Sequence, residues 1–197
     1  MAFEYAVALT GSIATGKSTA VDILSRYGFL FIDADKIAHQ ILDEQQTAIA
    51  EMFGMEFIEN SRVNRKALGA MVFSDPVKRK ELESLLHPFI YDEIERQALI
   101  QDAAKEPYII DIPLFFEGGR YPIERSLVVY TTKEQQLKRL MQRDGYNKEE
   151  ALKRIGSQID IDEKRERATY TVDNTGNLAQ LQYECEQVKE LILGDFK

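Results

Sequence analysis

The sequence predicts a three-layer α/β fold in which helices cover both faces of a five-stranded parallel sheet. Three features of the 197 residues indicate it. Short apolar runs alternate with segments of helical periodicity along the chain. A glycine-rich turn at residues 11–18 joins the first apolar run to the first helix. Residues 36–105 are helical in pattern and far longer than a crossover between two strands needs, which predicts an inserted helical lobe.

The predicted core elements follow one another in a regular order. The first strand is the apolar run at residues 5–9, and the helix after the glycine-rich turn ends at Gly28, a residue suited to a helix C-cap. Residues 29–32 form a continuous apolar run, which is typical of a strand buried on both faces. The later strands are expected at residues 108–113, 127–130 and 169–172, and the later core helices at residues 133–143, 148–158 and 178–193.

The inserted lobe is expected to be helical throughout. Asn64 is a predicted N-cap, and Asp75 places a capping residue before proline at the first helical position of the next helix. Pro88, which follows His87, is expected to break that helix and restart it. The core is therefore assigned to residues 1–33 and 106–197, and the lobe to residues 34–105.

Residues 11–18 fit the phosphate-binding loop pattern, in which glycine and four further residues precede Gly-Lys-Ser or Gly-Lys-Thr. Glycine lets the backbone approach a ligand closely, and the amides that open the next helix create a positive field. Lys17 can reach the β- and γ-phosphates of a nucleotide, and the Ser18 hydroxyl can ligate Mg²⁺. The alternative is an ordinary glycine-rich turn. The expected nucleotide-binding residues are Gly11, Ala14, Thr15, Gly16, Lys17, Ser18 and Thr19.

Acidic residues follow two predicted strands, at the edge of the sheet where ligands bind in open α/β folds. Asp33 and Asp35 come after the second strand, and Asp111 lies at the end of the third. In proteins with a phosphate-binding loop, an acid at the latter position often supports Mg²⁺. We therefore predict that Asp111 holds Mg²⁺ through water, and the alternative is a purely structural role.

Composition and charge argue against several classes of protein. The net charge of −8 disfavours general nucleic-acid binding, although Lys and Arg outnumber Asp and Glu by ten to eight between residues 133 and 167, which suits a small polyanionic ligand. The single cysteine, Cys185, lies on an apolar helical face, so packing is its expected role. No apolar run reaches membrane-spanning length and no signal-peptide pattern opens the sequence, so we expect a cytoplasmic protein with no membrane partner.

With these residues in view, the chain resembles the nucleoside monophosphate kinase group and, more specifically, the dephospho-CoA kinase family. The matching stretches occur in the family's order over nearly the whole chain. Asp-Ala-Asp after the second strand, combined with the Leu-Lys-Arg and Gln-Arg-Asp run, is the specific part. The sequence departs from many members at Ser12–Thr15, where they carry more glycine, but these side chains are small. The stretches are Leu9–Gly11, Ile32–Asp35, Leu86–Pro88, Pro113–Glu117, Leu137–Asp144 and Val172–Asn174.

The resemblance implies the last step of coenzyme A synthesis, in which ATP phosphorylates the ribose 3′-hydroxyl of dephospho-coenzyme A with Mg²⁺ as cofactor. It also implies a short arginine-bearing lid, here at residues 137–166. The nearest rival function is another small-molecule kinase, for nucleoside monophosphates or a sugar-like acid. A GTP-dependent switch or a regulatory nucleotide-binding module is a more distant alternative, because the sequence lacks the guanine-reading pattern Asn-Lys-x-Asp.

Asp33 is the predicted catalytic base. The Asp33 carboxylate would bind and orient the acceptor hydroxyl and would accept its proton. Lys17 is the other catalytic residue predicted in the core. The alternative for Asp33 is a helix N-cap before Lys36, a role that Asp35 fits better.

Arg139 and Arg143 are the predicted catalytic arginines of the lid. They are four residues apart and share a helix face, and their guanidinium groups suit phosphate oxygens. The alternative for either is a surface ion pair with Glu134 or Asp144. Arg154 is a weaker candidate for the same task.

Three further residues are predicted to contact ligands. Asn174, in the turn after the fifth strand, could read the edge of adenine, and its alternative is an ordinary turn residue. In the lobe, Arg65 and the neighbouring Lys66 are candidates for the phosphates of the acceptor, with plain exposed charge as the alternative. His87 is assigned to substrate binding rather than to proton transfer, and its alternative is a helix-end residue.

Overall fold

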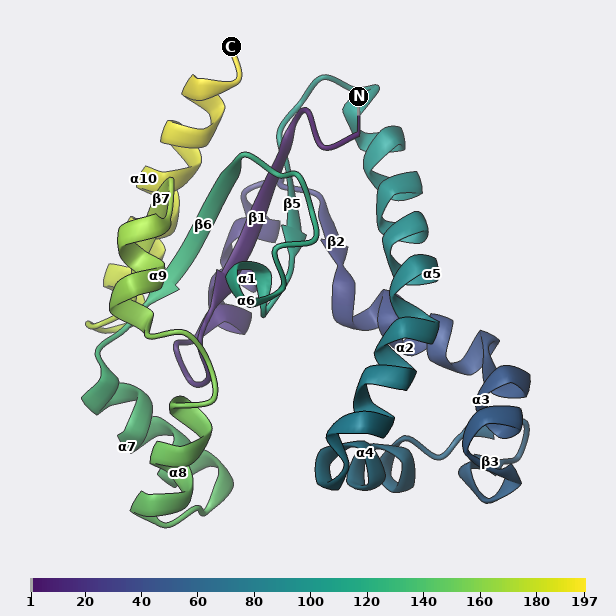
Figure 1. Cartoon of the computed structure of the whole chain (residues 1–197). Coiled ribbons are helices and arrows are strands. Elements are labelled where there is room, and N and C mark those ends of the chain that lie inside the picture. The colour runs from purple at the N-terminus through teal and green to yellow at the C-terminus, as the bar shows by residue number, and fades with distance from the viewer. Residues whose placement is uncertain (1) are drawn as a thin grey trace. The chain divides into compact units, whose positions relative to one another are not determined.

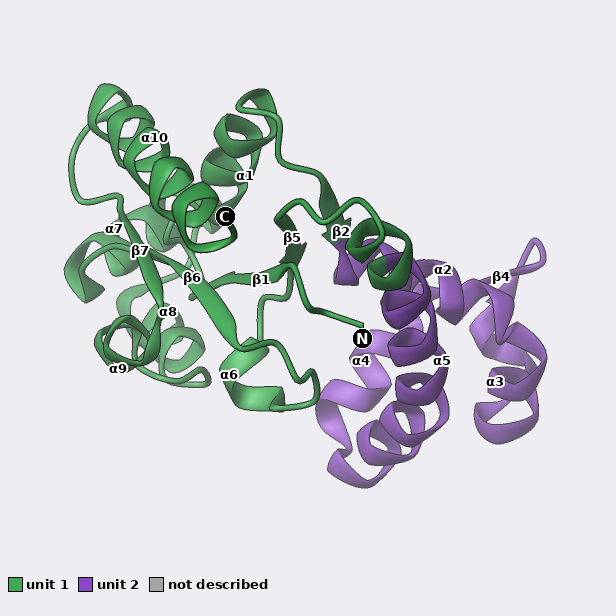
Figure 2. Ribbon diagram, turned by 90° about the horizontal axis from the view of Figure 1, so that it is seen from above, with its two compact units in different colours: residues 1–32, 98–197 green, residues 33–97 purple. Residues whose placement is uncertain are grey.

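The computed structural model describes residues 2–197, which form two compact units. The first unit contains the chain up to Ile32 together with Ala98–Lys197, and the second contains Asp33–Gln97 (Figure 2). The predicted lobe, residues 34–105, extends past the second unit at its carboxyl end, because helix α5 (Pro76–Asp102) runs across the division without interruption.

A five-stranded sheet forms the centre of the first unit (Figure 1), in the order β2-β5-β1-β6-β7. Strand β1 pairs in parallel with β5 and β6, and β6 pairs in parallel with β7. The predicted α/β fold is therefore confirmed. Because β1 is the central strand, the turn after it lies at the middle of the carboxyl edge of the sheet. The strands are β1 (Ala6–Gly11), β2 (Phe31–Asp33), β5 (Tyr108–Asp111), β6 (Arg125–Tyr130) and β7 (Tyr170–Asp173).

Helices cover both faces of this sheet, as Figure 2 shows. On one face α1 (Lys17–Arg26) and α10 (Leu178–Asp195) enclose the larger apolar core, which includes Cys185. Burial raises the pKa of the Cys185 thiol to about 12, so this cysteine stays protonated at neutral pH and acts in packing. On the other face, α9 (Ile161–Arg167) and the short α6 (Phe115–Gly118) cover a smaller core.

The second unit combines helices with a small antiparallel hairpin that the sequence did not predict. The hairpin pairs β3 (Ile58–Glu59) with β4 (Arg62–Val63). Between them Asn60 and Ser61 both take positive φ, 49° and 59°, as a two-residue hairpin turn requires. Strands of two residues are too short to show the alternation of apolar and polar residues by which a strand is recognised in a sequence. The helices of this unit are α2 (Ala34–Glu44), α3 (Gln46–Phe53), α4 (Arg65–Ser74) and the amino-terminal part of α5.

The expected break at Pro88 is wrong, because α5 is one helix of 27 residues that runs through this proline. A proline inside a helix removes one backbone hydrogen bond and crowds the preceding turn. Leu86 and Ile94 are buried on either side of it, and burial of apolar side chains supplies most helix stability in a folded protein. Charged residues are spread along α5.

No helix within residues 2–197 is both long and apolar enough to cross a membrane.

Candidate active site

The loop between β1 and α1 adopts a backbone conformation that favours glycine. Gly16, the N-cap of α1, has a φ of 91°, and a Cβ atom there would lie 2.1 Å from Nδ2 of Asn174. A Cβ atom on Gly11 would lie 2.8 Å from Oγ1 of Thr15. Larger residues at either position would therefore force the loop or its neighbours to move.

Two predicted site residues hold the end of this loop. The Thr15 carbonyl accepts hydrogen bonds from Nη1 of Arg139 at 3.3 Å and from Nδ2 of Asn174 at 2.7 Å. Nη2 of Arg139 also donates to the backbone carbonyl of Asn174 at 2.9 Å, so Arg139 holds both the loop and the residue that carries the second donor. Arg139 comes from α7 (Lys133–Asp144), and Asn174 directly follows β7. In this structure both side chains contact the backbone of the loop, a task that the sequence did not predict.

Further side chains hold the beginning and middle of the loop. The Ile13 carbonyl accepts a hydrogen bond from Nε2 of Gln136 at 2.8 Å, and the Ile13 amide donates to Oε1 of Gln158 at 2.8 Å. The Gly11 carbonyl accepts a hydrogen bond from Nζ of Lys164 at 2.9 Å. We call Gln136, Arg139, Lys164 and Asn174 the clamping side chains, because each donates to a loop carbonyl.

The clamping side chains determine which way the loop amides face. In a trans peptide the carbonyl and the following N–H point in opposite directions, and no peptide bond between the described residues is cis. Binding the carbonyls of residues 11, 13 and 15 therefore turns the amides of residues 12, 14 and 16 away from the clamping side chains. The α1 helix begins directly after these amides, and an anion can bind at a helix N-terminus.

Lys17, Ser18 and Thr19 form the first turn of α1. Nζ of Lys17 forms an ion pair with the carboxylate of Asp111 and lies 2.6 Å from its Oδ2. Both side chains are mostly buried, with exposed fractions of 21% and 14%. Asp111 ends β5, directly beside β1, so the sheet brings these two predicted site residues together.

Arg143 is not held at the loop. Its guanidinium forms a two-bonded ion pair with the next residue, Asp144, at 2.8 and 3.0 Å, and it is 60% exposed. This hydrogen bonding lowers the pKa of Asp144 and raises that of Arg143. The structure thus shows the surface pair that the sequence left as the alternative. Arg154, on α8 (Lys148–Ile155), lies over the ring of Tyr146 at 4.3 Å.

Asp33 ends β2 and caps α2. Its Oδ1 accepts a hydrogen bond from the Lys36 amide at 2.9 Å, and its Oδ2 lies 3.3 Å from Nζ of Lys36. Asp35 lies in the first turn of the helix instead. The expectation that Asp35 is the better cap is therefore wrong, because Asp33 has the extended backbone that an N-cap needs.

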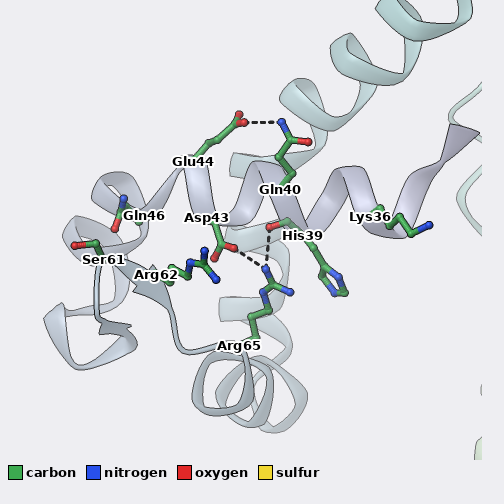
Figure 3. A pocket seen from close by; sticks show the side chains of 9 residues that line it. All are labelled: Lys36, His39, Gln40, Asp43, Glu44, Gln46, Ser61, Arg62 and Arg65. Atoms are coloured by element: carbon green, nitrogen blue, oxygen red, sulfur yellow. Dashed lines mark hydrogen bonds and ion pairs between the residues drawn. The ribbon is translucent and has the colours of Figure 1, made fainter.

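The second unit contains a polar pocket of about 600 Å³, drawn in Figure 3. Four of its lining residues have basic side chains: Lys36, His39, Arg62 and Arg65. Nη2 of Arg65 donates to Oδ2 of Asp43 at 2.6 Å and lies 3.5 Å from the His39 carbonyl. Burial by itself would raise the pKa of Asp43, but the hydrogen bonds from Arg65 and the Val63 amide, and the charge of Arg62, together hold it below its usual value. The pocket therefore carries fixed charge of both signs, with the cations in excess.

The remaining predicted substrate residues lie elsewhere in the second unit. His87 lies inside α5, half-buried, and does not line the pocket. Lys66 follows Arg65 in α4 but is exposed and does not line it either.

Sequence reasoning missed Gln136, Gln158 and Lys164. Lys164 was detectable in part, because it lies three residues after Ile161, on the helix face that a short helix would bury. The two glutamines carry no comparable signal, since an amide side chain suits a helix surface equally well.

A phosphate-binding loop at the centre of the sheet, with Lys17 and an acid from the next strand beside it, is the arrangement of a P-loop nucleotide-binding protein. Comparison with known proteins narrows this class. The family profile described as dephospho-CoA kinase matches residues 5–180, and the chain belongs to the dephospho-CoA kinase family.

Individual relatives agree with this assignment over almost the full length of the chain. A protein of Sulfurimonas denitrificans named dephospho-CoA kinase is 53% identical, and the match covers 98% of this chain and 96% of the relative. A protein of Wolinella succinogenes with the same name is 45% identical, with coverages of 98% and 97%. The solved structure of dephospho-CoA kinase from Campylobacter jejuni has a TM-score of 0.72 at 38% identity, and the match covers 96% of this chain and 98% of that one.

Proposed function

We propose that this protein transfers the γ-phosphoryl group of ATP to the ribose 3′-hydroxyl of dephospho-coenzyme A, producing coenzyme A and ADP. The observation that carries the proposal is the clamped loop with Lys17 at the start of α1, in a chain of the dephospho-CoA kinase family. The test is an ATP turnover assay with a panel of acceptors. Dephospho-coenzyme A should be phosphorylated, and preferred turnover of a nucleoside monophosphate or a sugar acid would contradict the proposal.

The chain's own residues fit ATP with Mg²⁺. The Ser18 hydroxyl and the Asp111 carboxylate are oxygen donors, which Mg²⁺ prefers. Within residues 2–197 no group of three or more His, Cys, Asp and Glu side chains could hold a metal, which fits an ion bound mainly by phosphates and water. Such an ion supplies neutralisation of charge on the phosphates. Ser18 would ligate it directly and Asp111 through water, while Lys17 would contact the β- and γ-phosphates.

Asp33 is proposed to orient the acceptor hydroxyl and to accept its proton. Its role as the cap of α2 does not conflict with this, because a carboxylate has about four lone-pair sites and the amide and ammonium groups of Lys36 use two of them. The hydrogen bond from the Lys36 amide also holds the carboxylate in one orientation, as a positioned base requires.

The pocket of Figure 3 is proposed to bind phosphate oxygens of the acceptor through Arg65. We expect Arg65→Ala to raise the KM for dephospho-coenzyme A by about 10–100-fold, because one charged hydrogen bond contributes about 1.5–3 kcal/mol. The KM for ATP should not change. Steady-state kinetics on Arg65→Ala and on the matched control Lys66→Ala would test this. Equal effects of the two substitutions would contradict the assignment.

The lid is proposed to comprise residues 137–166, but the structure suggests that its two ends move little. Arg139 and Lys164 are both bound to the loop backbone. Between them α8 packs on α7 through an apolar cluster that also contacts Ile13 and Ala14.

We expect closure to be a shift of α8 and its flanking turns against α7 and the loop. Hydrogen exchange should then slow at residues 144–157 when a non-hydrolysable ATP analogue and dephospho-coenzyme A bind, with little change at residues 158–166. The measurement is amide exchange with and without both ligands. A sample with the ATP analogue alone is the control, because it shows whether closure also needs the acceptor. Unchanged exchange across residues 144–157 would exclude a moving lid.

A further inference from the structure

Lys164 is a fully buried cation in a protein that otherwise exposes most of its lysines. Its side chain is 0% exposed, and Nζ forms an ion pair with Oε1 of Glu117 at 2.7 Å. The same Nζ donates to the Gly11 carbonyl at 2.9 Å. A buried charge is costly unless it is paired and hydrogen-bonded, and Lys164 meets both conditions at the first residue of the phosphate-binding loop.

Glu117, the ion-pair partner of Lys164, also binds the segment that precedes α9. Its Oε1 also accepts a hydrogen bond from the Ile159 amide at 3.1 Å, while its Oε2 is buried with no hydrogen-bond partner among residues 2–197. Lys164 therefore supplies the main compensation for the charge of this carboxylate. Removing either partner alone leaves the other charge buried and poorly compensated.

We propose that Lys164 is a positioning residue for phosphoryl transfer, which sets the orientation of the first peptide of the loop through its bond to the Gly11 carbonyl. That bond turns the Ser12 amide in the opposite direction, away from the clamping side chains. The proposal rests on the proposed phosphotransfer to the extent that the loop binds ATP. Small misplacements of groups that bind a reacting phosphate reduce the rate by as much as about 10²-fold.

A double-mutant cycle separates this role from a purely structural one. Lys164→Met keeps the length of the side chain but removes its charge, so we expect a lower melting temperature and a fall in kcat/KM for ATP of about 10²-fold. Lys164→Met/Glu117→Gln removes both charges and should regain much of the melting temperature, since neutral replacements of buried ion pairs are often tolerated. Because the Gly11 carbonyl still lacks its donor, kcat/KM should stay low.

Two further variants complete the experiment. Glu117→Gln keeps the bond from Lys164 to Gly11, so it should lower kcat/KM much less than Lys164→Met does. Lys133→Met is the matched control, because Lys133 forms an ion pair with Asp160, the N-cap of α9, and is not among the side chains bonded to the loop. Its kcat/KM should equal that of the unmodified protein.

Binding of ATP, measured by calorimetry without any acceptor, keeps this test independent of the acceptor's identity. We expect weaker binding to the double variant than to the unmodified protein at a temperature where both are folded. The proposal is overturned if the double variant regains turnover and ATP affinity together with its melting temperature, or if Glu117→Gln loses as much kcat/KM as Lys164→Met. If Lys164→Met alone does not fold, the double variant carries the test.

Discussion

Lys17→Ala is expected to remove almost all turnover while the protein stays folded. The ammonium group is the only side-chain cation within the glycine-rich loop, residues 11–18, and it stands at the first residue of α1. Loss of one charged contact to the transferring phosphate in a water-poor site costs about 3–4 kcal/mol, which corresponds to about 10²–10³-fold in kcat. The measurements are steady-state kinetics with ATP and dephospho-coenzyme A, and a thermal unfolding curve.

The ion pair with Asp111 makes a further comparison necessary. Lys17→Ala takes away a partner of a mostly buried carboxylate, so part of any loss could come from local rearrangement. Lys17→Ala/Asp111→Asn removes that charge as well and should regain stability without regaining turnover. Lys189→Ala, which removes an ion-paired lysine outside the loop, is the control for the loss of a lysine as such. Near-normal turnover by a folded Lys17→Ala protein would refute the assignment of Lys17.

The fold was predictable where burial leaves a continuous apolar run. Most strands of the sheet contain such a run, and the structure shifts the predicted ends by only a few residues. Strand β7 is the exception, because its side chains alternate between buried and half-buried. The short helix α9 was not predictable in the same way, since every residue after Ile161 in it is charged. Its place is determined by the Lys164 contact and the apolar core that Ile161 joins, and one buried pair three residues apart is too short a pattern to predict a helix.

The site was predictable where a local motif carries the chemistry. Residues 11–18 match the phosphate-binding loop pattern and lie between a predicted strand and a predicted helix, and Asp111 was found because acids at strand ends recur beside such loops. The clamping role of Arg139 was not predictable, because its contact with the Thr15 carbonyl joins residues 124 positions apart. Lys164 and Gly11 are 153 positions apart. Contacts of this kind depend on the finished packing of α7 and α9 against the loop, and a single sequence does not specify which of several arginines or lysines will make them.

Asp33→Asn is the second substitution for which we expect a large effect, a fall in kcat of about 10²–10⁴-fold with nearly unchanged ATP affinity. Asparagine keeps the size of the side chain and an oxygen that can accept the Lys36 amide, so α2 should keep its cap and the free energy of unfolding should barely change. It cannot accept a proton from the acceptor hydroxyl. The measurements are kcat, the KM for both substrates and thermal unfolding.

Asp111→Asn, measured beside Asp33→Asn, decides which carboxylate is the base. Asp111 is paired with Lys17, so its loss should disturb the loop and raise the KM for ATP as well as lower kcat. Asp33 contacts Lys36 at the start of α2, so Asp33→Asn should not change the KM for ATP. If Asp33 is only a helix cap, Asp33→Asn will retain full kcat, because asparagine caps a helix about as well as aspartate. A large loss of kcat confined to Asp111→Asn would move the proton acceptor to the end of β5 and leave Asp33 with the structural role that its hydrogen bond to the Lys36 amide already gives it.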